Sequence, residues 1–129
     1  MKFENKKWYV LLHLSMNMWG DNKAPFNFDT DTYHDILKQM AERGYKHLIL
    51  DVGDCLQYEK HKDIAIEGAW SYERAARETQ YAKELGIEII PKLNFSTTHS
   101  GWLGIYQNML ATRRYYSVCA DIIRDVAEI

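Results

Sequence analysis

The sequence predicts an α/β protein of parallel β/α units, with about three strands and three helices that form a fragment of a TIM barrel. Three apolar runs alternate with three segments of helical periodicity, which is typical of a parallel sheet. The helix-to-strand connections are very short, whereas the strand-to-helix connections are long. Long loops on that side build the active sites of β/α barrels, so the asymmetry favours a barrel.

The alternative is a doubly wound sheet, which normally carries a glycine-rich phosphate loop after its first strand. No G-x-G-x-x-G or G-x-x-x-x-G-K-[ST] motif occurs anywhere in the chain. The barrel is therefore the preferred interpretation, and the doubly wound fold stays open as the second.

The first unit begins with a nearly continuous apolar run at residues 8–14, which predicts a strand covered on both faces. A loop at 15–28 follows, and Asp29, Thr30 or Asp31 can cap the next helix. That helix is expected to run to about Arg43, with Gly44 as its left-handed stop.

The second unit has its strand at 47–52, a long polar loop at 53–70, and a helix at 72–85 capped by Ser71. The third strand is expected at 87–93, with Pro91 near its end or at a bulge because proline cannot donate a ladder hydrogen bond. A loop of roughly twenty residues precedes a third helix. That helix shows apolar residues at i+4 spacing: Val118, Ile122, Val126 and Ile129.

The chain of 129 residues carries 16 basic and 18 acidic side chains, interspersed along its length. No basic stripe points to a nucleic-acid partner, and no apolar run is long enough to span a membrane. Cys55 and Cys119 lack metal-type spacing, so we expect two free thiols and a cytoplasmic protein.

A complete barrel needs about 250 residues. Residues 1–129 are thus expected to be its N-terminal part, with open sheet edges through which copies could self-associate.

Polar and aromatic residues gather after the three strands, a mixture typical of small-ligand clefts. We expect them to bind a small molecule or an oligosaccharide. The expected ligand-binding residues are Asn17, Trp19, Asp51, Asp54, Asn94, His99 and Trp102. Four of them have a structural alternative: a salt bridge for Asp51, solvation for Asp54, and a barrel lid for Trp19 and Trp102. His13 is expected to be a hydrogen-bonded core histidine. The histidines show no metal-ligand spacing, so no metal and no cofactor are predicted.

Residues 45–104 resemble the barrel of hexosaminidase-type glycoside hydrolases. The resemblance rests on the acid that closes the second strand (Asp51), on Leu-Gly-Ile-Glu-Ile-Ile-Pro-Lys-Leu at 85–93, and on Thr-His-Ser at 98–100. It implies that Asp51 and His99 lie in a sugar pocket. Lys92 stands where the family has an acid after the proline, and Thr98 where it has a glycine.

The resemblance also implies a catalytic Asp-Glu pair after a fourth strand, which the 129 residues do not contain. The sequence therefore predicts a fragment of a carbohydrate-active enzyme and leaves open whether the chain itself is active. Two alternatives stay open beside it. One is a non-catalytic self-associating half-barrel or carbohydrate-binding module, and the other is an unrelated barrel lyase or aldolase that uses Lys92 as a Schiff-base lysine.

Overall fold

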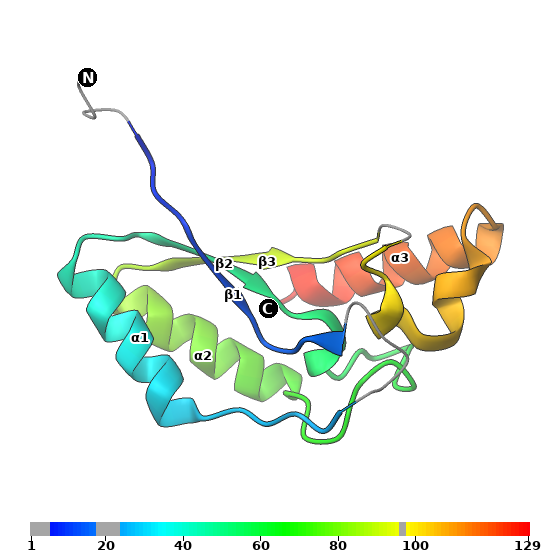
Figure 1. The fold of residues 1–129 in the computed structure, drawn as a ribbon, viewed down its shortest axis with the longest axis horizontal. Helices are drawn as coiled ribbons and strands as arrows, with labels where there is room; N and C mark the ends of the chain where they lie inside the picture. The colour runs from blue at the N-terminus through cyan, green and yellow to red at the C-terminus, as the bar shows by residue number, and fades with distance from the viewer. Residues whose placement is uncertain (1–5, 18–23, 96–97) are drawn as a thin grey trace.

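The computed structural model describes residues 6–17, 24–95 and 98–129. Within these ranges, strands and helices alternate along the chain, as Figure 1 shows. The elements are β1 (Val10–His13), α1 (Thr30–Glu42), β2 (His47–Asp51), η2 (Gly53–Cys55), α2 (Tyr72–Glu84), β3 (Glu88–Lys92), η3 (Gly101–Met109) and α3 (Arg113–Ala127). The three strands form one parallel sheet in the order β1-β2-β3. This confirms the expected α/β class with a parallel sheet.

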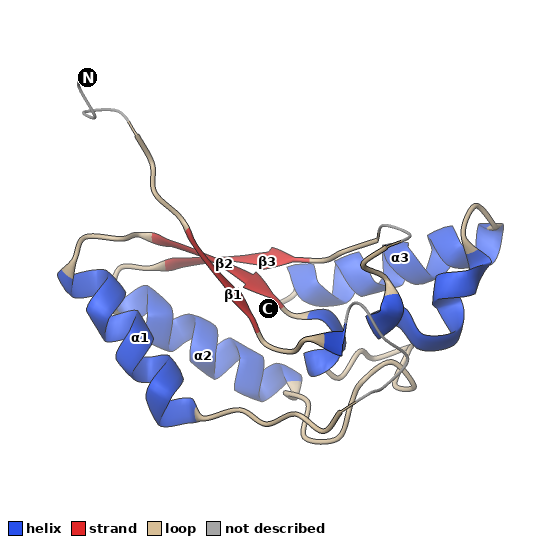
Figure 2. Ribbon diagram, viewed as in Figure 1, coloured by secondary structure: helices blue, strands red, loops and turns tan. Residues whose placement is uncertain are grey.

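One face of the sheet is covered by helices. Side chains alternate between the faces of a strand, and Leu48 and Leu50 of β2 are buried in the core. The buried side chains of α1, Leu37 among them, belong to the same core. Figure 2 shows α1 and α2 on the same side of the strands.

Within the described residues, no helix covers the other face of the sheet. Leu11 of β1 is 49% exposed there, and Ile49 of β2 is half-buried. The expectation of a first strand covered on both faces is therefore wrong, because the helices pack on one side only. β1 is also shorter than expected: Trp8 and Tyr9 lie outside it and are exposed. Apolar sequence signals a tendency to be buried, whereas a strand also needs a paired neighbour.

The helix ends follow the local signals in the sequence. Asp29 accepts a hydrogen bond from the Thr32 N–H at the start of α1, and Ser71 does the same for Arg74 at the start of α2. Gly44 and Gly86 follow these helices with φ of 76° in both cases. Glycine adopts this left-handed conformation without a steric penalty, so both expected helix stops are confirmed.

Pro91 lies in β3 next to its last residue, as expected. Glu88 N–H donates to Lys46 C=O, and Val52 N–H donates to Lys92 C=O. Residues 88, 90 and 92 therefore direct their backbone polar groups toward β2, and residue 91 directs its nitrogen away from it. The missing N–H of Pro91 thus costs no hydrogen bond within the described sheet.

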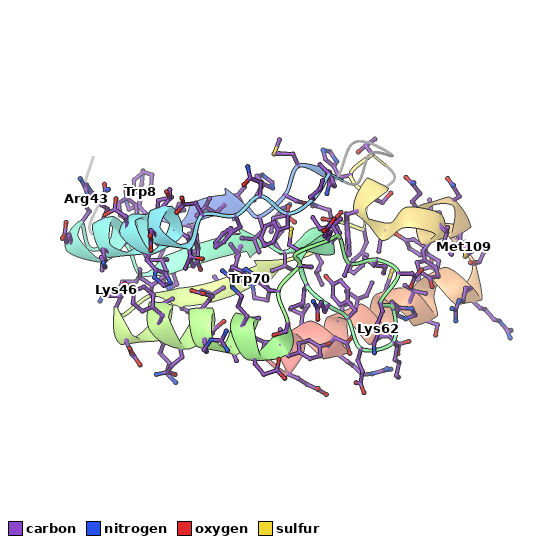
Figure 3. All side chains as sticks on the ribbon, turned by 90° about the horizontal axis from the view of Figure 1, so that it is seen from below. Trp8, Arg43, Lys46, Lys62, Trp70 and Met109 are labelled. Carbon is purple, nitrogen blue, oxygen red and sulfur yellow. The ribbon has the colours of Figure 1, made fainter. Side chains whose placement is uncertain are left out.

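α3 packs on the loop that follows β2. The Asp125 carboxylate accepts a hydrogen bond from the Glu59 N–H at 2.9 Å, and Asp121 contacts Lys60 and His61. Figure 3 shows this loop, with Lys62, alongside α3. The long segment before α3 is partly ordered as η3, which the sequence pattern did not indicate. Within the described ranges, the helices are all too short or too polar to cross a bilayer.

Candidate functional site

The last residues of the three strands stand side by side. His13, Asp51 and Lys92 are the final residues of β1, β2 and β3, and the strand register pairs His13 with Asp51 and Asp51 with Lys92. Their side chains share one face because they have the same parity along their strands. The register therefore places an imidazole, a carboxylate and an ammonium in one row at the carboxyl edge of the sheet.

These three side chains and Asn94 meet at a single oxygen atom. Asp51 Oδ2 lies 2.6 Å from Lys92 Nζ, 2.9 Å from Asn94 Nδ2 and 3.0 Å from His13 Nδ1. Lys92 also donates to Asn94 Oδ1 at 2.8 Å. We call the four residues His13, Asp51, Lys92 and Asn94 the rim cluster. Four polar groups from three consecutive strand ends thus form one connected network.

Burial within the rim cluster is uneven. Asp51 is only 4% exposed, whereas the side chains of His13 and Lys92 are 30% and 31% exposed. A carboxylate so far from water needs a partner, and the Lys92 ammonium supplies the opposite charge. The cluster therefore has a buried anionic centre with two half-buried groups that can contact a ligand from the open side of the sheet.

The wall beside the cluster is aromatic. Trp102 of η3 is 1% exposed, and its indole N–H donates to the Asn94 carbonyl at 2.8 Å. It packs near Gly53, whose φ of 40° is one that side chains with a Cβ rarely adopt. Tyr58 donates to the Gly53 carbonyl at 2.5 Å. These contacts fix the backbone after β2 and β3, so Trp102 is a buried support of the cluster and not a lid.

Asp54 belongs to a second, deeper network. Its side chain is fully buried and accepts hydrogen bonds from Ser15 Oγ at 2.8 Å and from Asn17 Nδ2 at 3.0 Å. Asn17 is buried as well. We call Asp54, Ser15 and Asn17 the Asp54 anchor, because they tie the loop after β1 to η2. The solvated position considered for Asp54 is wrong, since the folded chain surrounds it.

The expected ligand-binding residues thus fall into separate groups. Asp51 and Asn94 come together in the rim cluster, whereas Asn17 and Asp54 belong to the buried Asp54 anchor. His99 is half-buried, and its Nδ1 lies 2.9 Å from Thr98 Oγ1. Trp19 lies outside the described residues.

Two residues of the cluster were not among the expected ligand contacts. The sequence pattern predicts a hydrogen-bonded core histidine at His13, and it offers Lys92 only as the Schiff-base lysine of the alternative lyase or aldolase. Both are the last residues of their strands, and both share the parity of Asp51. That parity is the signal that could have joined them to Asp51.

The two cysteines are free and buried. Burial raises the pKa of the Cys55 thiol to about 12 and also raises the pKa of Cys119. Neither thiol is therefore primed as a nucleophile. In the described part of the chain, no three His, Cys, Asp or Glu side chains gather in a way that could hold a metal ion.

Comparison with known proteins gives no family assignment. No protein-family model matches the chain, and no curated protein matches it. The geometry of the rim cluster is therefore the observation that a proposed function has to explain.

Proposed function

We propose that residues 1–129 are the N-terminal part of a β/α barrel that binds a glycan at the carboxyl ends of its strands. The rim cluster is the observation that carries this proposal, because it places charged and polar groups at the carboxyl ends of three adjacent parallel strands. Ligands of β/α barrels bind at that edge. The long strand-to-helix connections lie on the same side, and one of them supplies Trp102 as a buried support beside the cluster.

The hydrogen-bonding capacity of the cluster supports a polyhydroxylated ligand. All three donors to Asp51 use Oδ2, so within the described residues Oδ1 accepts no hydrogen bond. A carboxylate oxygen can accept from a sugar hydroxyl, and a lysine ammonium can donate to one. A neutral sugar therefore suits a site whose central charges, Asp51 and Lys92, already neutralise each other.

The proposal concerns binding by these residues, not hydrolysis. The resemblance to hexosaminidases places the catalytic Asp-Glu pair after a fourth strand, and the described sheet has three. The resemblance does make N-acetylhexosamines the first sugars to test, and the proposal stands or falls on binding alone.

Ligand-observed NMR tests it directly. We expect saturation transfer from the protein to N-acetylglucosamine or its β-1,4-linked disaccharide, with the signal lost in Asp51→Asn and Asn94→Ala. Asn108→Ala is the matched control, because Asn108 is exposed on η3 and the substitution is the same. The absence of transfer from a panel of neutral mono- and disaccharides, or equal transfer in all variants, would contradict the proposal.

A second candidate function is a self-associating half-barrel, and the open sheet face favours it. Leu11 of β1 is 49% exposed on that face, and β1 and β3 are the edges of the described sheet. Light scattering separates the candidates, since a defined dimer supports self-association. The aldolase alternative has less support, because the Lys92 ammonium forms an ion pair with Asp51 and an ammonium has no electron pair for attack on a carbonyl.

A further inference from the structure

We infer that His13 and Asp51 form a proton-transfer pair, in which Asp51 holds the Nδ1–H of His13 and leaves Nε2 as the basic nitrogen of the site. The inference rests on the proposed function only for the location of the ligand. It concerns which ring nitrogen carries the proton and what the other nitrogen can do.

The position of the proton follows from the partners of Asp51. Oδ2 accepts from the Lys92 ammonium, which can only donate. Oδ2 also accepts from the Asn94 amide, whose own oxygen accepts from Lys92, so the orientation of that amide is fixed. A carboxylate with two such donors is ionised and acts as an acceptor only. The proton between Asp51 and His13 therefore sits on His13 Nδ1.

The other ring nitrogen is then free to accept a proton. Within the described residues His13 Nε2 has no hydrogen-bond partner, and the side chain is 30% exposed. A neutral imidazole bonded through Nδ1–H carries its electron pair on Nε2. The Asp51 carboxylate stabilises the imidazolium that forms when Nε2 takes a proton, which is the role of the aspartate in a Ser-His-Asp triad.

The step itself is a simple transfer. The electron pair of Nε2 takes the proton of a ligand hydroxyl or a water molecule, and the electrons of the broken O–H bond stay on the oxygen. Lys92 contacts the same Asp51 oxygen as His13 and holds that carboxylate in place while Nε2 takes the proton. His13 therefore fits the role of general base in this site.

The other histidines provide an internal contrast. His34, His47 and His61 all turn Nε2 toward their carboxylate partners, which are Glu78, Glu88 and Asp121. In the pairs of His34 and His61, which are within hydrogen-bond distance, the carboxylate holds the Nε2–H form. Among the His–carboxylate pairs of the described residues, His13 alone uses Nδ1, so it should differ from them in tautomer.

Long-range ¹H–¹⁵N correlation spectra of the histidine rings measure this difference without any ligand. We expect His13 in the Nδ1–H form and His34 and His61 in the Nε2–H form. Asp51→Asn should abolish the preference of His13 and leave His34 unchanged. If His13 of the wild type is in the Nε2–H form, or if Asp51→Asn leaves its tautomer unchanged, the inference is wrong.

Acylation by diethyl pyrocarbonate, mapped by peptide mass spectrometry, tests the reactivity of Nε2. His13 should react faster than the buried His61, and Asp51→Asn should slow the reaction of His13, because the acceptor that fixes its Nδ1–H form is lost. Equal rates at His13 in both proteins would overturn the inference. If Asp51→Asn does not fold, the tautomer of His13 in the wild type still decides. Failure of the chain to bind sugars would leave this result standing, so the two proposals fail separately.

Discussion

Replacement of Asp54 tests whether this residue anchors the fold or contacts the ligand. Its carboxylate is fully buried and accepts from Ser15 and Asn17. A hydrogen bond to a charged group contributes about 1.5–3 kcal/mol. Asp54→Ala removes both bonds and leaves the buried Asn17 amide without an acceptor. Part of the loss is offset because the desolvation cost of a buried carboxylate disappears as well. We expect a net destabilisation of about 2–4 kcal/mol.

Asp54→Asn should cost less than Asp54→Ala. An asparagine can turn its oxygen toward Asn17 Nδ2 and its amide toward Ser15 Oγ, since a hydroxyl oxygen can accept as well as donate. Both contacts then survive without the charge. The expected destabilisation is about 1 kcal/mol.

Urea unfolding followed by circular dichroism measures both effects. With a slope of about 2 kcal/mol per M, Asp54→Ala should lower the midpoint by about 1–2 M. Glu67→Ala is the control, because Glu67 is exposed and such surface changes usually stay within about 0.5 kcal/mol. If Asp54→Ala shifts the midpoint no more than Glu67→Ala, the anchor role is wrong, and a ligand contact by Asp54 becomes the better explanation.

Three further predictions concern other parts of the chain. The hydrogen bond from His61 holds the pKa of Asp121 below its ordinary value of 3.8. The stabilisation it gives is therefore complete above that value and is lost as the pH falls through the lowered pKa of the folded state. The urea midpoints of the wild type and Asp121→Asn should accordingly converge below pH 3.8, and a constant difference down to the lowest pH would refute this. Cys55, whose pKa is raised to about 12 by burial, should resist iodoacetamide in the folded chain and react once urea unfolds it, as mass spectrometry would show. Ser71→Ala should cost about 1 kcal/mol in urea unfolding, because it removes the cap of α2, and no change in the midpoint would contradict the cap.

Local signals predicted much of the fold. Helix starts were predicted from the capping side chains of Asp29 and Ser71, and helix ends from Gly44 and Gly86. Capping and left-handed stops involve residues only a few positions apart, so the local sequence already specifies them. The alternation of apolar runs with helical periodicity likewise predicted the three parallel strands, and every one of them is present. The ends of the strands were less well predicted, because pairing and not hydrophobicity decides where a strand stops.

The candidate site was predicted only in part. The sequence predicted a ligand-binding role for Asp51 and Asn94, because each is a polar residue at or just beyond the end of an apolar run. It did not indicate that His13 and Lys92 meet Asp51, since these contacts join residues 38 and 41 positions apart. It also could not separate Asp54 from Asp51, because burial depends on which segments cover a residue.

The sequence by itself determined the α/β class, the order of the elements and most helix ends, because periodicity and capping act over a few residues. The tertiary structure decided which polar side chains share one carboxylate oxygen, which nitrogen of His13 faces it, and that α3 rests on the loop after β2. These features depend on strand register and packing between distant segments, and both exist only once the chain has folded.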